Sequence, residues 1–284
     1  RAELKIISSR INPFYNNTVQ KFRKGHSGYG GKSYGESFGV DTKVNEDMVL
    51  GVAGFASETK MKHKDIKSGD TTDISSHMLS VYASHHINNL WSMYSVATVG
   101  INSISNNFLK PSRAADESVD SKYDAMSFNG EVTLSYKQPI AYSVVMNPIA
   151  GLRYSRVNGA GYSEQGSTTG QNLTVASKEL SKLDTLVGLR LLSTSIDMAG
   201  VPVTPEAHVV VNYNVLGNSQ KQTVRVDGSG HFASASYKPA RVSYNVGASF
   251  NAEYDMVEFG MGYDAQISDK RMGHQGNLKL CVSF

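Results

Sequence analysis

The chain has 284 residues, of which 40% are hydrophobic and 19% are charged, and its formal net charge is +3. That length fits either two small domains or one large all-β unit. The small charge gives no reason to expect nucleic-acid binding. A transmembrane helix needs about 18 consecutive apolar residues, and no stretch approaches that length. Cys281 is the only cysteine, which excludes intrachain disulfides and cysteine-based zinc sites.

Alternation of apolar and polar residues predicts strands along nearly the whole chain. Successive side chains of a strand point to opposite faces, so a period of two indicates one apolar and one polar face. The predicted strands, in chain order, are residues 12–24, 31–44, 48–63, 74–87, 90–106, 122–137, 142–157, 181–195, 201–216, 241–253, 256–267 and 274–284. The pattern is weakest in residues 12–24. Both faces carry apolar residues from 74 to 101, so the register there stays open.

The length of these strands favours a membrane-spanning barrel. Several runs extend over about ten to fourteen residues, whereas ordinary strands average about five or six and a tilted membrane-spanning strand needs about nine to eleven. The polar face consists mainly of Gly, Ser and Asn with a few charges, as in residues 242–254. A soluble sandwich would use shorter strands and bury its apolar faces against each other. The pattern therefore indicates a barrel that is apolar outside and polar inside.

The lengths of the predicted connections also alternate. Short links are residues 45–47, 88–89, 138–141, 196–200 and 254–255, and long or Gly-rich ones are 25–30, 64–73, 107–121, 158–180 and 217–240, followed by an intermediate one at 268–273. Bacterial outer-membrane barrels have short periplasmic turns and longer outer loops. We therefore predict an all-β fold, a membrane-spanning antiparallel up-and-down β-barrel of about 12 strands with both ends on the short-turn side. The alternative is a soluble β-protein with irregular loops.

The last eight residues, NLKLCVSF, alternate up to the end of the chain, with Leu278, Leu280, Val282 and Phe284 on one face. In lipid every backbone N–H and C=O must be satisfied internally, so the last strand is expected to pair with the first and leave no edge. Phe284 is then an outward aromatic residue at the periplasmic interface, where aromatic rings lie at the headgroup level.

The polar faces collect charged and amide side chains that we predict to line the pore. They are Glu131, Arg153, Arg190, Asn212, Asn245, Glu253, Glu258, Asp264, Asn277 and Lys279. A central Arg or Lys on the lipid face would cost about 2–4 kcal/mol, whereas a hydrated interior tolerates it. The mixed signs predict a lining past which a polypeptide can slide. The alternative is that these residues form cross-strand ion pairs that brace the wall.

No residue pattern points to catalysis, a metal or a cofactor, and we predict none of them. His85 and His86 are adjacent on a strand and therefore point to opposite faces, so they do not bind one ion together. No Ser–His–Asp arrangement of a hydrolase is recognisable. The pair Asn16 and Asn17 resembles a site of asparagine cyclisation but falls in the first predicted strand, where a polar pair is the simpler interpretation.

The chain resembles the β-barrel translocator domain of autotransporters, the classical type V secretion proteins. The segments that carry the resemblance are residues 147–155, 183–191, 203–206, 246–248, 262–265 and 276–284. Residues 13–15 and 35–41 are similar to the surface-antigen autotransporters of rickettsiae. The resemblance covers nearly the whole chain.

The resemblance implies an integral domain of the bacterial outer membrane that anchors an N-terminal passenger and mediates its export to the cell surface. In such proteins a helix joins the passenger to the first strand and fills the pore. Residues 1–11 are then the linker and the remnant of that helix entering the pore, and residues 12–284 are the barrel. The passenger itself is not part of this sequence, and Arg1 opens a charged, polar segment, so we expect any signal peptide upstream of it. The alternative function is a stand-alone outer-membrane pore for small solutes.

The resemblance also implies partners. They are the passenger, outer-membrane lipid and lipopolysaccharide, and the barrel-assembly machinery. The alternation that ends in Leu278, Leu280, Val282 and Phe284 resembles the signal which that machinery reads by strand pairing. The alternative is that these four residues only face lipid.

Overall fold

The computed structural model of the chain describes residues 6–11, 14–20, 28–64, 67–112, 115–193, 196–198, 200–217, 221–226, 231–235, 240–269 and 271–283. Phe284, predicted as the outward aromatic residue, lies outside them. In this part of the chain, no helix is both long and apolar enough to cross a membrane.

Almost every described residue belongs to a strand or a short turn. The strands are β1 Ile6–Ile11, β2 Phe14–Gln20, β3 Tyr29–Asn45, β4 Met48–His63, β5 Thr71–His86, β6 Trp91–Lys110, β7 Glu117–Tyr136, β8 Gln138–Ala141, β9 Val144–Gly159, β10 Tyr162–Ser163, β11 Leu173–Val175, β12 Lys178–Ser193, β13 Ile196–Met198, β14 Val201–Gly217, β15 Lys221–Val226, β16 His231–Ala235, β17 Val242–Tyr254, β18 Val257–Ser268 and β19 Arg271–Ser283. Each long strand lies within a few residues of a predicted one.

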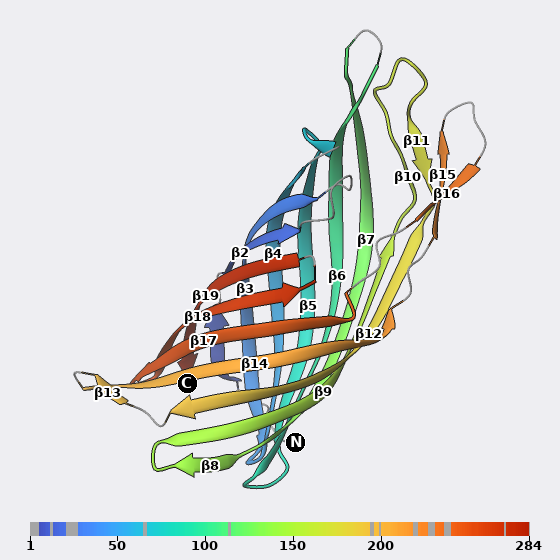
Figure 1. Ribbon diagram of the computed structural model, residues 1–284. Helices are drawn as coiled ribbons and strands as arrows, with labels where there is room; N and C mark the ends of the chain where they lie inside the picture. The colour runs from blue at the N-terminus through green and yellow to red at the C-terminus, as the bar shows by residue number, and fades with distance from the viewer. Residues whose placement is uncertain are drawn as a thin grey trace, which may run out of the picture.

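The long strands form a closed ring (Figure 1). Neighbouring strands pair antiparallel in the order β3, β4, β5, β6, β7, β9, β12, β14, β17, β18 and β19, and both β1 and β2 pair with β19 on one side and β3 on the other. Ser8 faces Ser283 and Asp41, and six residues later Phe14 faces Asn277 and Gly35. β1 and β2 are therefore two halves of one strand in one register. With β8 and β13 as short extensions, the ring has twelve positions, which confirms the predicted up-and-down barrel.

The prediction of a helix remnant was wrong for residues 6–11, which form β1. The physical reason lies in the length of β19, which β2 pairs only from Asn277 to Arg271. Without β1, the backbone of residues 280–283 would have no partner on the edge of β19 that faces β2. Each unpaired backbone N–H or C=O in lipid costs several kcal/mol. Residues 1–5 of the predicted linker lie outside the described part.

The short turns lie at one end of the ring, and several use the residues that predicted them. The side-chain Oδ1 of Asn45 accepts a hydrogen bond from the backbone N–H of Asp47 at 3.0 Å, and Asn88 accepts from Leu90 and Trp91 at 2.9 Å. Gly200 has a φ of 86°, which a glycine adopts without strain.

Two predicted connections were placed wrongly. Residues 138–141 are not a turn: they form β8 and continue the register of β7 against β9, so the turn lies at residues 142–143. The link at 268–273 is not intermediate in length, because Ser268 already pairs with Arg271. Pro139 and Gly273, which suggested connections in the sequence, therefore lie inside strands of this sheet.

The two faces of the ring differ as predicted. On β7, Met126 is 66% exposed and Val132 is 47% exposed, whereas Ala125, which comes directly before Met126 and points to the other face, is 3% exposed. At about 3.4 Å per residue and a tilt of about 40°, the outward run from Met126 to Tyr136 spans roughly 26 Å, close to the roughly 25 Å of a lipid-facing band. Trp91 and Tyr136 lie with ring centroids 5.0 Å apart at its short-turn end, as in an aromatic girdle.

A second, smaller sheet lies beyond the other end of the ring (Figure 1). Its strand order is β10, β11, β15, β16, and it is built from the two longest connections, which the sequence left as loops. The ring of Tyr162 stacks on that of Tyr123 of β7 at 4.5 Å, and Lys110 of β6 pairs with Glu164 at 3.0 Å. Burial raises the pKa of Tyr162 to about 12. This outer sheet is therefore packed against the β6–β7 hairpin.

A single carboxylate holds the loop between β10 and β11 to the start of β7. Glu117 accepts hydrogen bonds from the hydroxyls of Ser167 at 2.6 Å, Thr168 at 2.5 Å and Thr169 at 2.9 Å. These bonds lower the pKa of Glu117 from 4.5 to about 2, and the bond from Ser167 has the largest effect. Such bonds favour the ionised form.

We expect this loop to stay ordered in mild acid and to loosen only near pH 2. Because the folded pKa lies below the unfolded one, the contribution of Glu117 is complete above pH 4.5 and is lost as the pH falls through about 2. Amide hydrogen exchange of residues 167–171, compared with the intrinsic rate, should rise between pH 4 and pH 2. Glu117→Gln should raise the exchange rate already at pH 4. Glu179→Gln, which removes a half-exposed carboxylate from the start of β12, should not. Equal exchange in all three proteins would contradict this role.

Candidate functional site

All ten residues predicted to line the pore lie on the face of the ring opposite to the exposed apolar side chains. Residues that face each other across a ladder share a face. Glu131 faces Arg153 from β7 to β9, and Glu253 faces Glu258 from β17 to β18. On β19, Asn277 and Lys279 alternate with the exposed Leu278 and Leu280 and therefore point to the opposite face.

Several of these residues form ion pairs along the inner wall. Arg153 Nε lies 2.6 Å from Glu131 Oε2, and Lys279 Nζ lies 2.7 Å from Glu258 Oε1. The side chains are between 22% and 33% exposed, so the pairs are partly hydrated. Pairs at this level of exposure contribute little net stability, about 0–1 kcal/mol each. Each pair leaves the inner wall almost neutral at that point. This fits both predicted alternatives, a lining past which a polypeptide can slide and ion pairs that stabilise the wall.

A larger charged cluster, which the sequence revealed only in part, crosses β12, β14 and β18. Arg190 Nε lies 2.9 Å from Glu206 Oε1, and His208 Nε2 lies 2.9 Å from Asp264 Oδ1. Between His208 and Asp264 runs β17, where Gly247 faces both of them. A Cβ on Gly247 would lie 2.4 Å from the Asp264 oxygen and 2.5 Å from the His208 ring. Glycine at this position therefore lets the two side chains meet across a strand.

Four other titratable residues on the lumen face were not predicted as site residues. They are Lys182, Asp184, Glu206 and His208. Lys182 Nζ contacts Asp184 Oδ2 at 2.7 Å. Glu206 and His208 share the parity of Asn212 on one strand, so the same alternation would have found them.

The wall from β3 to β7 is different, because hydroxyls and amides predominate there. Thr72 donates to Asn106 at 2.8 Å, and Asn106 donates to Ser121 at 3.1 Å, so one chain of bonds crosses from β5 to β7. Four residues further along β5, Ser76 donates to Asn102 of β6 at 2.7 Å. The sequence left this register open, because apolar residues occur on both faces of residues 74–101. The lumen thus has one mainly uncharged side and one side with ion pairs.

The closing strand presents three of the four predicted signal residues on its outward face. Leu278 and Leu280 are exposed, and Val282 has the same parity. Val282 faces Val257 on one side and Ser9 of β1 on the other, so the end of β19 is paired on both edges. Inward-facing Cys281 is buried.

Among the described residues, no group of three His, Cys, Asp or Glu side chains is arranged to hold a metal ion. His85 and His86 follow the predicted opposition, since His86 bonds to Ser92 on the inward face while His85 faces Met93 on the outward one. Asn16 and Asn17 lie in β2 between β19 and β3.

A closed antiparallel ring, an exposed apolar band of membrane height and a polar interior define a transmembrane β-barrel of the outer-membrane kind. The family model described as "Autotransporter beta-domain" matches residues 10–264. The chain belongs to this family and is an integral domain of the bacterial outer membrane.

Relatives and solved structures agree with this assignment. The chain is 32% identical over 279 residues to outer membrane protein B of Rickettsia conorii and 31% identical over 282 residues to outer membrane protein A of the same organism. Each match includes 96% of this chain, but the matched region is only 17% of outer membrane protein B and 14% of outer membrane protein A. The translocator domain of the autotransporter NalP from Neisseria meningitidis has the same fold, with a TM-score of 0.80 at 14% identity over 99% of this chain and 89% of that one. The beta domain of the Bordetella autotransporter Brka gives 0.67 at 13% identity, over 98% and 100%.

Proposed function

We propose that this barrel anchors an N-terminal passenger in the outer membrane and exports it to the cell surface. The observation that carries the proposal is the membership of residues 10–264 in the autotransporter β-domain family. The place of the first strand supports it. β1 begins beside Thr42, at the end of the ring where the short turns lie. A passenger attached before β1 at that periplasmic end would reach the surface only through the lumen.

The inner wall suits the passage of an extended polypeptide. Most of its charges are locally paired, as in Arg153 with Glu131 and Arg190 with Glu206, so a passing chain meets no large field of one sign. Residues 1–5 would then serve as the last part of the linker to the passenger.

The proposal is tested with an epitope tag. A signal peptide, the tag and a helical linker are placed before Arg1, and intact cells are treated with protease. We expect the tag to be removed while the barrel stays intact and heat-modifiable and a periplasmic marker stays protected. A tag that remains protected beside a folded barrel would contradict export. It would favour the alternative, a pore for small solutes, which single-channel conductance would then measure.

We further propose that Leu278, Leu280, Val282 and Phe284 form the signal by which the barrel-assembly machinery recognises the chain. Strand pairing provides the mechanism, because an apolar-faced terminal strand can add to an exposed sheet edge. The outward exposure of Leu278 and Leu280 supports this role.

We expect Leu280→Asp to block assembly of the barrel in cells. The change places a carboxylate on the outward face of β19, where lipid or a pairing partner would have to desolvate it. Lys279→Gln, one residue away, should be nearly silent, since it alters only a hydrated contact with Glu258. The measurement is the fraction of heat-modifiable protein in outer-membrane preparations, and deletion of Phe284 should lower it too. Equal yields for the two point variants would rule out the assigned facing, and a normal yield without Phe284 would remove that residue from the signal.

A further inference from the structure

A groove of about 620 Å³ lies on the outward face of the barrel across β5, β6, β7 and β9. Its outward floor is apolar and consists of Leu79, Val99, Ile101, Met126 and Phe128, each between 40% and 66% exposed. The volume falls in the range of about 300–1,000 Å³ that small-molecule sites occupy. Because this face is turned toward lipid, the groove is open to acyl chains.

The rim of the groove is polar and lies at the edge of the lipid-facing band. The outward positions of β9 are apolar up to Tyr154 and become polar at Arg156 and Asn158, which both line the groove. On the opposite side of the groove, His77 of β5 lies at the same level as Asn158. This edge is on the side away from the short turns, near the end of β9 at Gly159, and therefore at the headgroup level of the outer leaflet.

Arg156 gives the rim a cation that can reach a lipid headgroup. One of its nitrogens lies 2.7 Å from Glu179, but about half of each side chain remains exposed. A guanidinium has five donors in a planar fork that matches phosphate, so contact with one carboxylate oxygen leaves others for a second anion. An Arg on the lipid face of a barrel costs much less near the interface than at the middle of the membrane.

We propose that this groove, here called the Arg156 groove, binds an acylated lipid with a phosphate headgroup in the outer leaflet. The acyl chain lies on the floor formed by Val99, Met126 and their neighbours, and the phosphate meets Arg156, with Asn158 and His77 at its sides. Apolar burial supplies affinity for any acyl chain, and the charge at the rim selects the phosphate. The proposal rests on the outer-membrane location of the barrel and not on passenger export.

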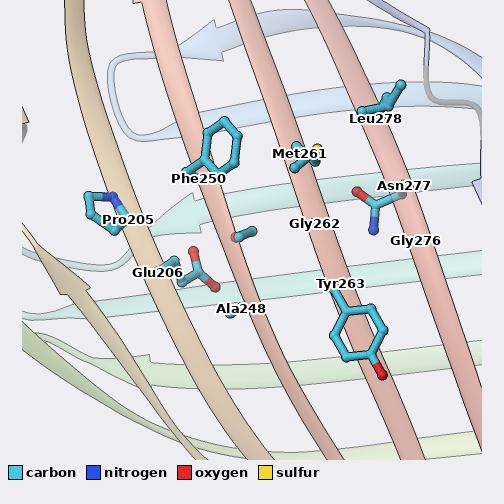
Figure 2. Close-up of a pocket in the computed structure, with 11 residues that line it drawn as sticks. Pro205, Glu206, Ala248, Phe250, Met261, Gly262, Tyr263, Gly276, Asn277 and Leu278 are labelled. Atoms are coloured by element: carbon cyan, nitrogen blue, oxygen red, sulfur yellow. The ribbon is translucent and has the colours of Figure 1, made fainter. Parts of the chain in front are cut away.

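A second groove on the same outward face provides an internal comparison. It has about 690 Å³ and runs across β14, β17, β18 and β19, where Phe250, Met261, Tyr263 and Leu278 stand around small residues such as Ala248 and Gly276 (Figure 2). None of the residues that line it is Lys, Arg or His. It therefore offers an apolar floor without a cationic rim, and we expect it to accept acyl chains without preference for phosphate.

The experiment uses the purified chain in detergent and native mass spectrometry. Three probes are titrated: lipid A, the same lipid without its phosphates, and glucosamine phosphate, which has the phosphate without acyl chains. We expect one lipid A to bind at least tenfold more tightly than its dephosphorylated form, and the free headgroup not to bind measurably. Arg156→Gln should weaken lipid A binding about tenfold and leave the dephosphorylated lipid unchanged. Ile101→Trp, which fills the floor, should weaken both lipids.

Two matched variants control for general effects. Lys122→Gln removes a cation from an exposed position of β7 that does not line the groove, and Met261→Trp fills the second groove. Neither should change the preference for lipid A, and all variants should keep heat-modifiable migration. Equal weakening by Lys122→Gln and Arg156→Gln would reduce the effect to net charge and overturn the proposal. Equal binding of the phosphorylated and dephosphorylated lipids by the unmodified protein would overturn it as well.

Discussion

Val132→Arg is expected to lower the free energy of unfolding of the membrane-inserted barrel by about 2–4 kcal/mol, the cost of an Arg near the middle of the lipid face of a β-barrel. Val132 is 47% exposed and lies on the outward face of β7, between Met126 and Tyr136 at the two limits of the apolar band. No carboxylate occupies the neighbouring outward positions of β9, where Leu152 faces Val132. The new charge would therefore be both desolvated and unpaired.

Thr133→Arg is the matched control, since the same side chain is added one residue further along the same strand. Thr133 points into the lumen, on the face that also carries Glu131, where water and a carboxylate can receive a guanidinium. We expect a change of less than about 1 kcal/mol. Urea unfolding of both variants in lipid vesicles measures the difference. Similar losses in the two proteins would mean that the inner and outer faces have been exchanged.

The alternation of side chains made most of the ring predictable. Residues 241–253 and 256–267 were predicted as strands, and β17 and β18 occupy Val242–Tyr254 and Val257–Ser268. A barrel wall has one environment on each side along its whole height, so a single period-two pattern carries both secondary structure and facing. The turns at Asn45 and Asn88 were visible for a local reason, because an Asn side chain can bond the backbone two residues on.

What the sequence did not reveal depends on partners distant in the chain. Residues 6–11 carry no clear alternation, and the resemblance to autotransporters predicted the end of a helix there, whereas pairing with the otherwise open edge of β19 makes them a strand. β11 and β15 come from two different connections and stabilise each other only once both are in place, as in the pair Val175 and Val224. The contact of His208 with Asp264 spans an intervening strand, so no spacing along one segment could indicate it.

The curvature of the wall also rests on residues that the alternation does not explain. Gly151 of β9 lies on the lumen face, and a Cβ there would be 2.5 Å from the carbonyl oxygen of Val132 and 2.7 Å from the side chain of Thr133. The carbonyl belongs to the backbone of β7, so it cannot rotate away as a long side chain would. Gly188 of β12 stands in the same relation to β14, with 2.6 Å to the carbonyl oxygen of Val209. Bare glycines on the inside allow adjacent strands to turn sharply toward the lumen.

Gly151→Ala is therefore expected to destabilise the barrel by about 1–3 kcal/mol, the usual cost of forcing a methyl group into filled space. Gly54→Ala is the matched control, because a Cβ at Gly54 would meet nothing within 4 Å. There the substitution should be neutral or stabilise by about 0.4–1 kcal/mol, since alanine restricts the unfolded chain. Urea unfolding in vesicles compares the two, and Gly188→Ala should behave like Gly151→Ala. If all three variants unfolded alike, close approach of the strands on the lumen side would not be what requires glycine, and the curvature would have to come from strand twist alone.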